Sequence, residues 1–375
     1  VLIASAAIFA AGGVRLFFRV QAVCFGLYLI GAVAIPVVVG LLGSQTGFLG
    51  NFDDYGTNLG VTDASGKLAA SATDAGFASS SFSFEQTLKS VSIFWFIFGF
   101  IFSSNYFAGE IRLRKRTHLY SMPGAVLLAV AVLLLLVPSF THLIGYDINA
   151  QFGLADPAAY GFAAGAPAYP ELIGIASGSP VISAIVILGF TIGLMVWLPQ
   201  TLMLVSRNMF AWSFDRVVPD RLSYVDPRSR SPLVAIGVML ALSIASTAVY
   251  SFTDWFSSLS ALLGLSLPLL ITAVAGTLLP YRQRELVENS PYSRRVAGVP
   301  LLTLVGALSI LGFSGAIAIL LWDPGSGASL SENPGKLGLA AIVYAVGLAI
   351  WFVARAVRRR QGIDIDLSYR ELPVQ

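Results

Sequence analysis

The sequence predicts an all-α, polytopic membrane protein, and two observations carry that prediction. Hydrophobic residues make up 56% of the 375 residues and charged residues only 11%, whereas a soluble domain has about 25% charged residues. The charged residues are also gathered between long apolar windows, and a helix needs about 20 apolar residues to cross a bilayer. A β-barrel is disfavoured, because its strands alternate apolar and polar residues and residues 125–138 are apolar throughout.

Uncharged windows predict where the membrane spans lie, since a charged side chain at the centre of a bilayer is costly. The first window, over 1–14, is too short to cross unaided, and we expect it to be the end of a span that begins upstream, the chain being N-terminally truncated. The windows that follow are each long enough to cross. They run over 20–52, 90–109, 117–146, 172–206, 231–253, 255–281, 296–322 and 337–354.

Eight helical cores are expected inside these windows. With the connections between them they would form one membrane domain over 15–357, and 358–375 would be a tail. The cores are 20–43, 91–109, 123–145, 180–206, 232–251, 256–280, 299–322 and 337–357.

Positive charges predict the orientation of these spans, because Lys and Arg are enriched in cytoplasmic loops. With eight crossings, all but three of the 23 Lys and Arg residues fall in alternate loops that share one side. The three exceptions are Lys67, Lys89 and Lys336. We therefore expect a multi-pass protein of the cytoplasmic membrane with a cytoplasmic C-terminus.

Two of the predicted exterior segments are long. Residues 44–88 are rich in Gly, Ser, Ala and Asp, and residues 147–178 contain several Pro and Gly residues. Such residues favour turns and loops, so we expect loops with little helix here.

The residue types at membrane depth exclude several classes of function. No Asp, Glu, Lys or Arg lies in the middle of a predicted span, although intramembrane proteases and carboxylate-based proton pumps need such groups. The single cysteine, Cys24, excludes an intrachain disulfide and a cysteine-based metal site. A net charge of +3, spread over short loops, disfavours nucleic-acid binding. We expect no metal, no cofactor and no enzymatic activity.

One span carries polar residues in its middle. The segment after Lys89 is apolar up to Phe98-Gly99-Phe100 and then continues with Ser103, Ser104, Asn105 and Tyr106. A glycine weakens the helix just before these polar residues, which need partners inside a membrane. Both features favour a helix interruption whose free backbone groups could bind a ligand. The alternative is that Gly99 allows close helix packing and the polar residues join neighbouring helices.

The connection between 206 and 232 carries a set of spaced residues, namely Ser206, Arg207, Ala211, Asp215, Pro219, Pro227, Arg228 and Pro232. This spacing resembles the signature loop of the amino acid, polyamine and organocation permease superfamily, which reads approximately S-R-x-x-x-A-x-x-x-D-G-x-x-P and ends in H-P-R-x-x-x-P. Two residues depart from that pattern: Arg216 stands in place of the glycine and Asp226 in place of the histidine.

The broken span is similar to the sixth span of the same superfamily. Phe98-Gly99-Phe100 matches its aromatic-x-Gly-Phe break, and Glu110 and Pro123 follow as in the family, although Ile101 replaces an acidic residue. The resemblance covers nearly the whole chain, from the end of a fourth span to a twelfth. It implies a leucine-transporter-like fold with two inverted repeats and a first span outside this sequence that supplies half of the substrate site.

The resemblance implies a secondary active transporter that moves an amino acid by alternating access. Residues Phe98, Gly99, Phe100, Ser103, Ser104 and Asn105 are then the candidates for substrate binding. Trp95 and Trp197 could line the same cavity or simply pack. Gln200 and Thr201, next to Pro199, are candidates for the region that couples transport to a proton, to sodium or to a counter-substrate.

The substrate that this portion of the chain favours is a neutral amino acid. No charged group at membrane depth could balance a second charge on the substrate, whereas backbone carbonyls and amides can bind a zwitterion. Two alternatives stay open, namely a non-transporting scaffold or receptor-like relative and, with less support, a polytopic membrane enzyme.

Overall fold

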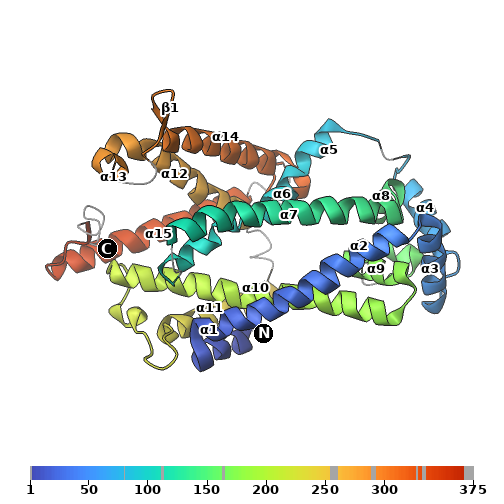
Figure 1. Ribbon diagram of the computed structural model, residues 1–375, viewed down its shortest axis with the longest axis horizontal. Coiled ribbons are helices and arrows are strands. Elements are labelled where there is room, and N and C mark those ends of the chain that lie inside the picture. The colour runs from blue at the N-terminus through green and yellow to red at the C-terminus, as the bar shows by residue number, and fades with distance from the viewer. Residues whose placement is uncertain are drawn as a thin grey trace. The chain divides into compact units, whose positions relative to one another are not determined.

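The chain folds into two compact units (Figure 1). Unit 1 comprises Val1–Phe82, Ser104–Ala211 and Arg221–Ala241, and unit 2 comprises Ser83–Ser103, Trp212–Asp220 and Leu242–Gln375. The computed structural model describes residues 2–79, 81–110, 114–162, 165–253, 261–288, 293–326, 328–331 and 335–366.

Seven helical stretches among the described residues are long and apolar enough to cross a membrane. They confirm the prediction of an all-α polytopic membrane protein. The elements that contain them are α1 (Leu2–Tyr28) with η1 (Leu29–Ala34) and α2 (Ile35–Leu42), α7 (Arg114–Ile144), α10 (Pro180–Phe214), α11 (Leu233–Phe252), α12 (Ala261–Arg282), α14 (Leu301–Trp322) and α15 (Gly335–Arg360).

Helix boundaries differ from the expected ones where a helix continues past its first charged residue. Helix α10 runs on from 206 to Phe214, because no Gly or Pro interrupts the sequence after Gln200. The beginning of the core predicted at 256–280 lies outside the described residues, which resume at Ala261.

The loop expected around Arg15 and Arg19 is instead helical, and the connection lies earlier, at Gly13. The element α1 (Leu2–Tyr28) consists of two helical segments that meet at Gly13, whose φ of 58° is rare for any residue with a side chain. A Cβ atom at Gly13 would lie 2.1 Å from the Ser229 carbonyl oxygen. The change of direction expected from a loop is therefore made by one glycine packed against the 226–231 turn.

The two long segments expected to contain little helix are largely helical, so that expectation is wrong. Their small polar residues cap helices: the Ser44 hydroxyl accepts from the Gly47 amide at 3.2 Å, and the Ser83 hydroxyl from the Gln86 amide at 3.3 Å. The elements are α3 (Gln45–Asn58), α4 (Ala64–Asp74), α5 (Phe84–Lys89), α8 (Tyr146–Leu154), η3 (Pro157–Tyr160) and α9 (Tyr169–Ser177).

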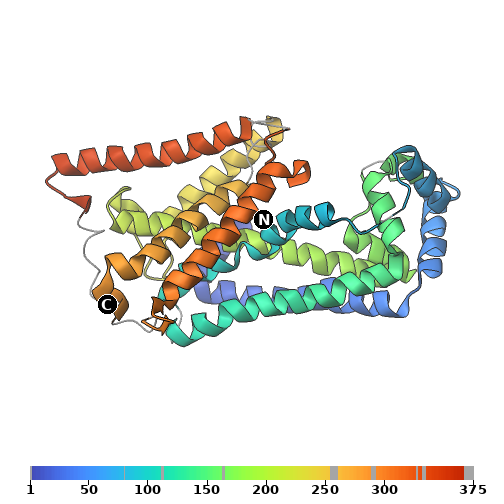
Figure 2. The same ribbon diagram turned by 90° about the horizontal axis from the view of Figure 1, so that it is seen from above.

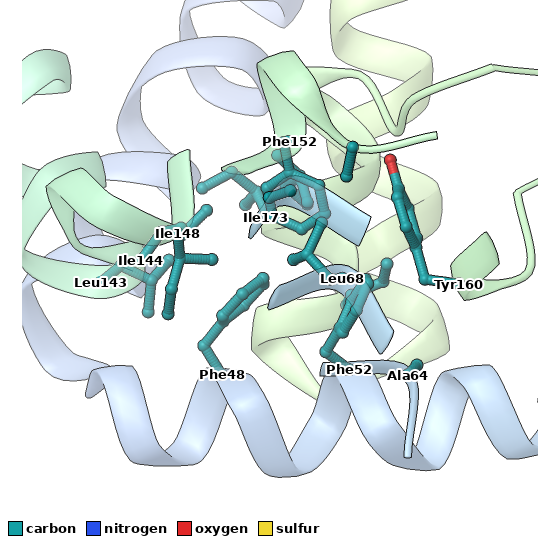
Figure 3. Packing of buried hydrophobic residues seen from close by; sticks show 14 of the residues in the cluster. Phe48, Phe52, Ala64, Leu68, Leu143, Ile144, Ile148, Phe152, Tyr160 and Ile173 are labelled. Carbon is teal, nitrogen blue, oxygen red and sulfur yellow. The ribbon is translucent and has the colours of Figure 1, made fainter. Parts of the chain in front are cut away.

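Five of these elements, α3, α4, α8, η3 and α9, form a helical cap in unit 1 with an aromatic core (Figure 3). Phe52 is fully buried, and its ring centroid lies 5.4 Å from that of Phe152 and 6.0 Å from that of Phe162. Aromatic pairs at such distances add stability beyond the area that they bury. The cap thus has its own packed core, which the Gly- and Ser-rich composition concealed.

The phenol of Tyr160 is the exception in this core. The Tyr160 side chain is fully buried, and no hydrogen-bond partner of its hydroxyl is found among the described residues. Burial, with the nearby Asp156 carboxylate, raises the pKa of Tyr160 above its ordinary value.

Helix pairs hold each unit together. In unit 1, α2 packs beside α7, and in unit 2, α12 packs beside α14 with α6 (Val91–Phe98) against α14 (Figures 1 and 2). The unit 2 core contains Leu263, Leu320 and Ala340. The remaining short elements are η2 (Ile101–Glu110), η4 (Asp220–Ser223), α13 (Arg284–Glu288), the paired strands β1 (Arg295–Val296) and β2 (Val299–Pro300), and η6 (Pro324–Ser326).

The segment expected as a helical core over 91–109 is not one continuous helix. Helix α6 ends at Phe98, Gly99 and Phe100 form a turn, and the 3-10 helix η2 follows from Ile101. The interruption therefore lies at the Phe-Gly-Phe sequence, where the glycine favoured it.

Candidate functional site

The broken helix ends in a well-packed part of unit 2. Trp95 donates from its indole Nε1 to the Ser266 hydroxyl at 2.7 Å, and its ring meets the edge of Phe313 with centroids 5.2 Å apart. Trp95 therefore packs between α12 and α14, as in the packing alternative of the sequence analysis.

Gly99 lies immediately after α6 and is buried. Its amide donates to the Trp95 carbonyl at 2.8 Å, and a Cβ atom at this position would lie 2.6 Å from the Trp95 carbonyl oxygen and 3.4 Å from Leu265. The Ser103 amide donates to the Phe100 carbonyl at 3.0 Å, while Asn105 is exposed. The Ser104 side chain lies outside the described residues. The turn thus places a buried glycine between two phenylalanines at the end of an apolar helix.

An open cavity of about 610 Å³ lies in unit 1 between α1 and α10, and lining side chains such as Phe25 and Trp197 are partly exposed. Its volume suits a small molecule. Two of the predicted residues, Trp197 and Gln200, line it. The full lining is Phe18, Gln21, Ala22, Cys24, Phe25, Tyr28, Phe190, Gly193, Leu194, Val196, Trp197 and Gln200, and we call it the aromatic cavity.

Close contact between two helices at one end shapes this cavity. A Cβ atom on Gly189 of α10 would lie 2.6 Å from the Gly31 Cα atom, and one on Gly193 would lie 2.3 Å from the Tyr28 ring. Small residues let helix backbones approach in a membrane. The chain adopts a π-helix at the same point, over Leu29–Ala34, and such turns are frequent at functional sites.

The aromatic cavity contains two side-chain amides, besides the polar groups of Tyr28, Trp197 and Cys24. Gln21 donates from Nε2 to the Gln200 Oε1 at 3.3 Å, joining α1 to α10. Every lining residue is uncharged. The cavity can therefore offer donors and acceptors to a polar molecule and aromatic faces to an apolar one, but no countercharge.

Sequence reasoning missed the α1 side of the cavity. The residues Phe18, Gln21, Phe25 and Tyr28 recur at intervals of three and four, which places them on one face of a helix. A glutamine on the same helical face as three aromatic residues was the feature of the sequence that could have predicted this side of the cavity. Thr201, by contrast, is exposed, and its hydroxyl donates to the Trp197 carbonyl at 3.1 Å, so it does not line this cavity.

The turn that ends α10 explains why the signature pattern has a glycine where this chain has Arg216. The Arg216 amide donates to Ser213 at 3.0 Å and the Val217 amide to Trp212 at 2.9 Å, which is the Schellman pattern of a helix end. Arg216 occupies the left-handed position with a φ of 59°. Arg216 therefore adopts the conformation for which the family pattern has glycine.

The turn at Asp226 is held by its own carboxylate. Asp226 Oδ2 accepts from the Ser229 amide at 2.7 Å and from the Ser229 hydroxyl at 3.0 Å. These hydrogen bonds, with that from the Arg228 amide, lower the pKa of Asp226. Asp226 thus closes the turn against which Gly13 packs.

Two further observations bear on what the site can be. Within the described ranges, no group of three or more His, Cys, Asp or Glu residues could hold a metal ion. A comparison with protein families gives a match to the amino acid permease family over residues 1–353, whereas no curated protein and no solved structure matches. The family match covers most of the chain and agrees with the signature loop and the Phe-Gly-Phe break, and the chain belongs to the amino acid permease family.

Proposed function

We propose that this permease is a secondary active transporter that moves a neutral amino acid across the cytoplasmic membrane by alternating access. The observation that carries the proposal is the aromatic cavity, in which an amide pair lies among aromatic side chains and every lining residue is uncharged. Removing a second charge from water without a countercharge is strongly unfavourable. An apolar or small zwitterion fits this chemistry better than a dicationic or anionic amino acid.

The break after α6 is the second place that supports substrate binding. We assign Phe98, Gly99 and Phe100 to contacts with the substrate, because interrupted helices of secondary transporters bind substrate at the break and α6 ends at this sequence. Ser103, Ser104 and Asn105 belong to the same assignment. We assign Trp197 and Gln200 to the aromatic cavity. Transport there would be coupled to a proton, to sodium or to a counter-substrate.

Cys24 offers a direct test, because it is the only cysteine of the chain, is half-buried and lines the aromatic cavity. The full-length protein, with Cys24 kept as its one cysteine, is reconstituted in liposomes and labelled with N-ethylmaleimide in the presence of single amino acids. Leucine, alanine or phenylalanine should slow the labelling of Cys24, and the same amino acids should be taken up.

Two results would contradict parts of the proposed function. Protection by arginine, lysine or polyamines, with none from neutral amino acids, would overturn the charge argument. Protection by neutral amino acids without any uptake would indicate a non-transporting relative.

The assignment of the helix break is tested by replacing Gly99 with Leu. Leucine would fill a buried position and favour a continuous helix, so uptake should be lost while the protein is still made. Unchanged uptake with an unchanged half-saturation concentration would show that the break does not bind substrate.

The proposed orientation places Lys67 outside the cell and Arg221 in the cytoplasm. In a Cys24→Ser background, an impermeant thiol reagent applied to intact cells should label Lys67→Cys and spare Arg221→Cys. Equal labelling at both positions would contradict the number of crossings.

A further inference from the structure

We propose that Arg358, near the end of α15, is a positioning residue for transport that holds the loop following α10. The inference rests on the proposed transport function, and all of the contacts that carry it lie in unit 2. Residues 215–220, between the end of α10 and the 3-10 helix η4, are called the α10 loop.

The Arg358 guanidinium binds three acceptors of the α10 loop. Nε donates to the Arg216 carbonyl at 2.9 Å, and Nη2 donates to the Val218 carbonyl at 3.4 Å and to the Asp220 carboxylate at 3.0 Å. The Arg358 side chain is only 16% exposed, whereas its partner Asp220 is 75% exposed. The ion pair itself therefore contributes little, and the two backbone carbonyls carry the contact.

This arrangement depends on the shape of arginine. Its donors diverge from a rigid plane, so that one side chain reaches acceptors in several directions, whereas lysine presents a single point charge. Nη1 also donates to the Gln361 side chain at 3.3 Å, so that all three guanidinium nitrogens are used. Hydrogen bonds from a charged donor are stronger than neutral ones.

The α10 loop has a defined conformation of its own. Its Schellman turn and the left-handed Arg216 give the loop a defined conformation. The Ser213 hydroxyl, which is almost fully buried, donates to the Pro219 carbonyl at 3.0 Å and closes the loop across its base. Arg358 therefore binds a structured set of carbonyls.

The end of α15 is equally well defined. The Gly362 amide donates to Arg359 at 3.1 Å and the Ile363 amide to Arg358 at 3.0 Å, which ends the helix in a second Schellman turn. The chain then folds back, with Arg355 paired to Asp366 and Ile365 buried. Arg358 thus joins two segments that are each already ordered.

The consequence for transport follows from the continuity of α10. Phe214, where α10 ends, is followed directly by the loop, and Gln200 of the aromatic cavity lies roughly 20 Å earlier along the same helix. Alternating access requires helices to change position. By holding the end of α10, Arg358 stabilises one arrangement of this helix and so sets the rate at which the transporter changes state.

The test compares Arg358→Gln and Arg358→Lys with Arg360→Gln, since Arg360 lies at the same helix end and is exposed. The full-length protein is assayed for the maximal rate and half-saturation concentration of uptake, per molecule in the membrane, and for the rate of Cys24 labelling. Arg358→Gln should lower the maximal rate by about tenfold and change the labelling rate, with a half-saturation concentration within about twofold. Lysine should restore part of the rate, and Arg360→Gln should match wild type.

Three outcomes decide the matter. If Arg358→Gln equals Arg360→Gln in both measurements, the proposal is wrong. If its uptake falls only because less protein reaches the membrane, Arg358 has a structural role alone and the proposal is again wrong. If the wild-type protein takes up no amino acid, the transport function fails, and the labelling rate of Cys24 still shows whether Arg358 controls the state of the cavity.

Discussion

The closest approach of two helices at the aromatic cavity yields a sharp prediction for Gly189→Ala. The added Cβ atom would lie 2.6 Å from the Gly31 Cα atom and 3.0 Å from the Gly31 carbonyl carbon. Both neighbours are backbone atoms, so no side-chain rotation can relieve the overlap. The two helices must separate by roughly 1 Å to reach an ordinary contact distance.

The magnitude follows from two opposing terms. Overpacking of a core costs about 1–3 kcal/mol, whereas replacing glycine by alanine inside a helix gains up to about 1 kcal/mol. We therefore expect Gly189→Ala to lower the stability of the protein by up to about 2 kcal/mol. Because the same crossing forms one end of the aromatic cavity, the half-saturation concentration for uptake should rise as well.

The matched control is Gly26→Ala. Gly26 lies in α1, and a Cβ atom there would meet nothing within 4 Å, so only the helix propensity term applies and stability should stay equal or rise. Thermal unfolding of the purified protein and uptake in liposomes are the measurements. If the two variants unfold at the same temperature and transport alike, the close contact between Gly31 and Gly189 does not determine the cavity.

Three further predictions concern other parts of the chain. Phe52→Ala should destabilise the helical cap by about 3–5 kcal/mol and expose 45–79 to limited proteolysis, whereas Phe82→Ala, at a side chain that is 85% exposed, should not. Arg216→Gly should raise the unfolding temperature, because glycine adopts a positive φ without strain, while the carbonyl that binds Arg358 is retained. Asp226 has a lowered pKa, so its stabilising effect is complete above its ordinary pKa of 3.8 and is lost as the pH falls through the lowered value. Asp226→Asn should therefore be less stable than wild type at pH 7. This difference in stability should shrink below pH 3.8.

The sequence by itself determined the class of the protein and the approximate positions of its long helices. A membrane span is defined by length and by the absence of charge, and both are properties of one continuous stretch. The Phe-Gly-Phe interruption was predictable for the same reason, since the weakness of a glycine and the needs of the following polar residues are local. The family was also recognisable, because the signature loop is contiguous in the sequence.

The helices of the cap were not predictable from composition. Gly and Ser between 44 and 79 favour loops locally, although the alanines among them favour helix. Phe52 packs against Phe152 and Phe162 far along the chain, and the burial of these rings outweighs the weak helix propensity of Gly and Ser.

The aromatic cavity and the Arg358 contact were decided by tertiary structure alone. Gln21 and Gln200 are separated by 179 positions, and Arg358 and Asp220 by 138. No local pattern encodes which of many glutamines or arginines will meet. Their partners depend on how closely the backbones approach, as at Gly31 and Gly189. They also depend on turns such as the left-handed one at Arg216, whose carbonyl meets Arg358 only when the helices are packed.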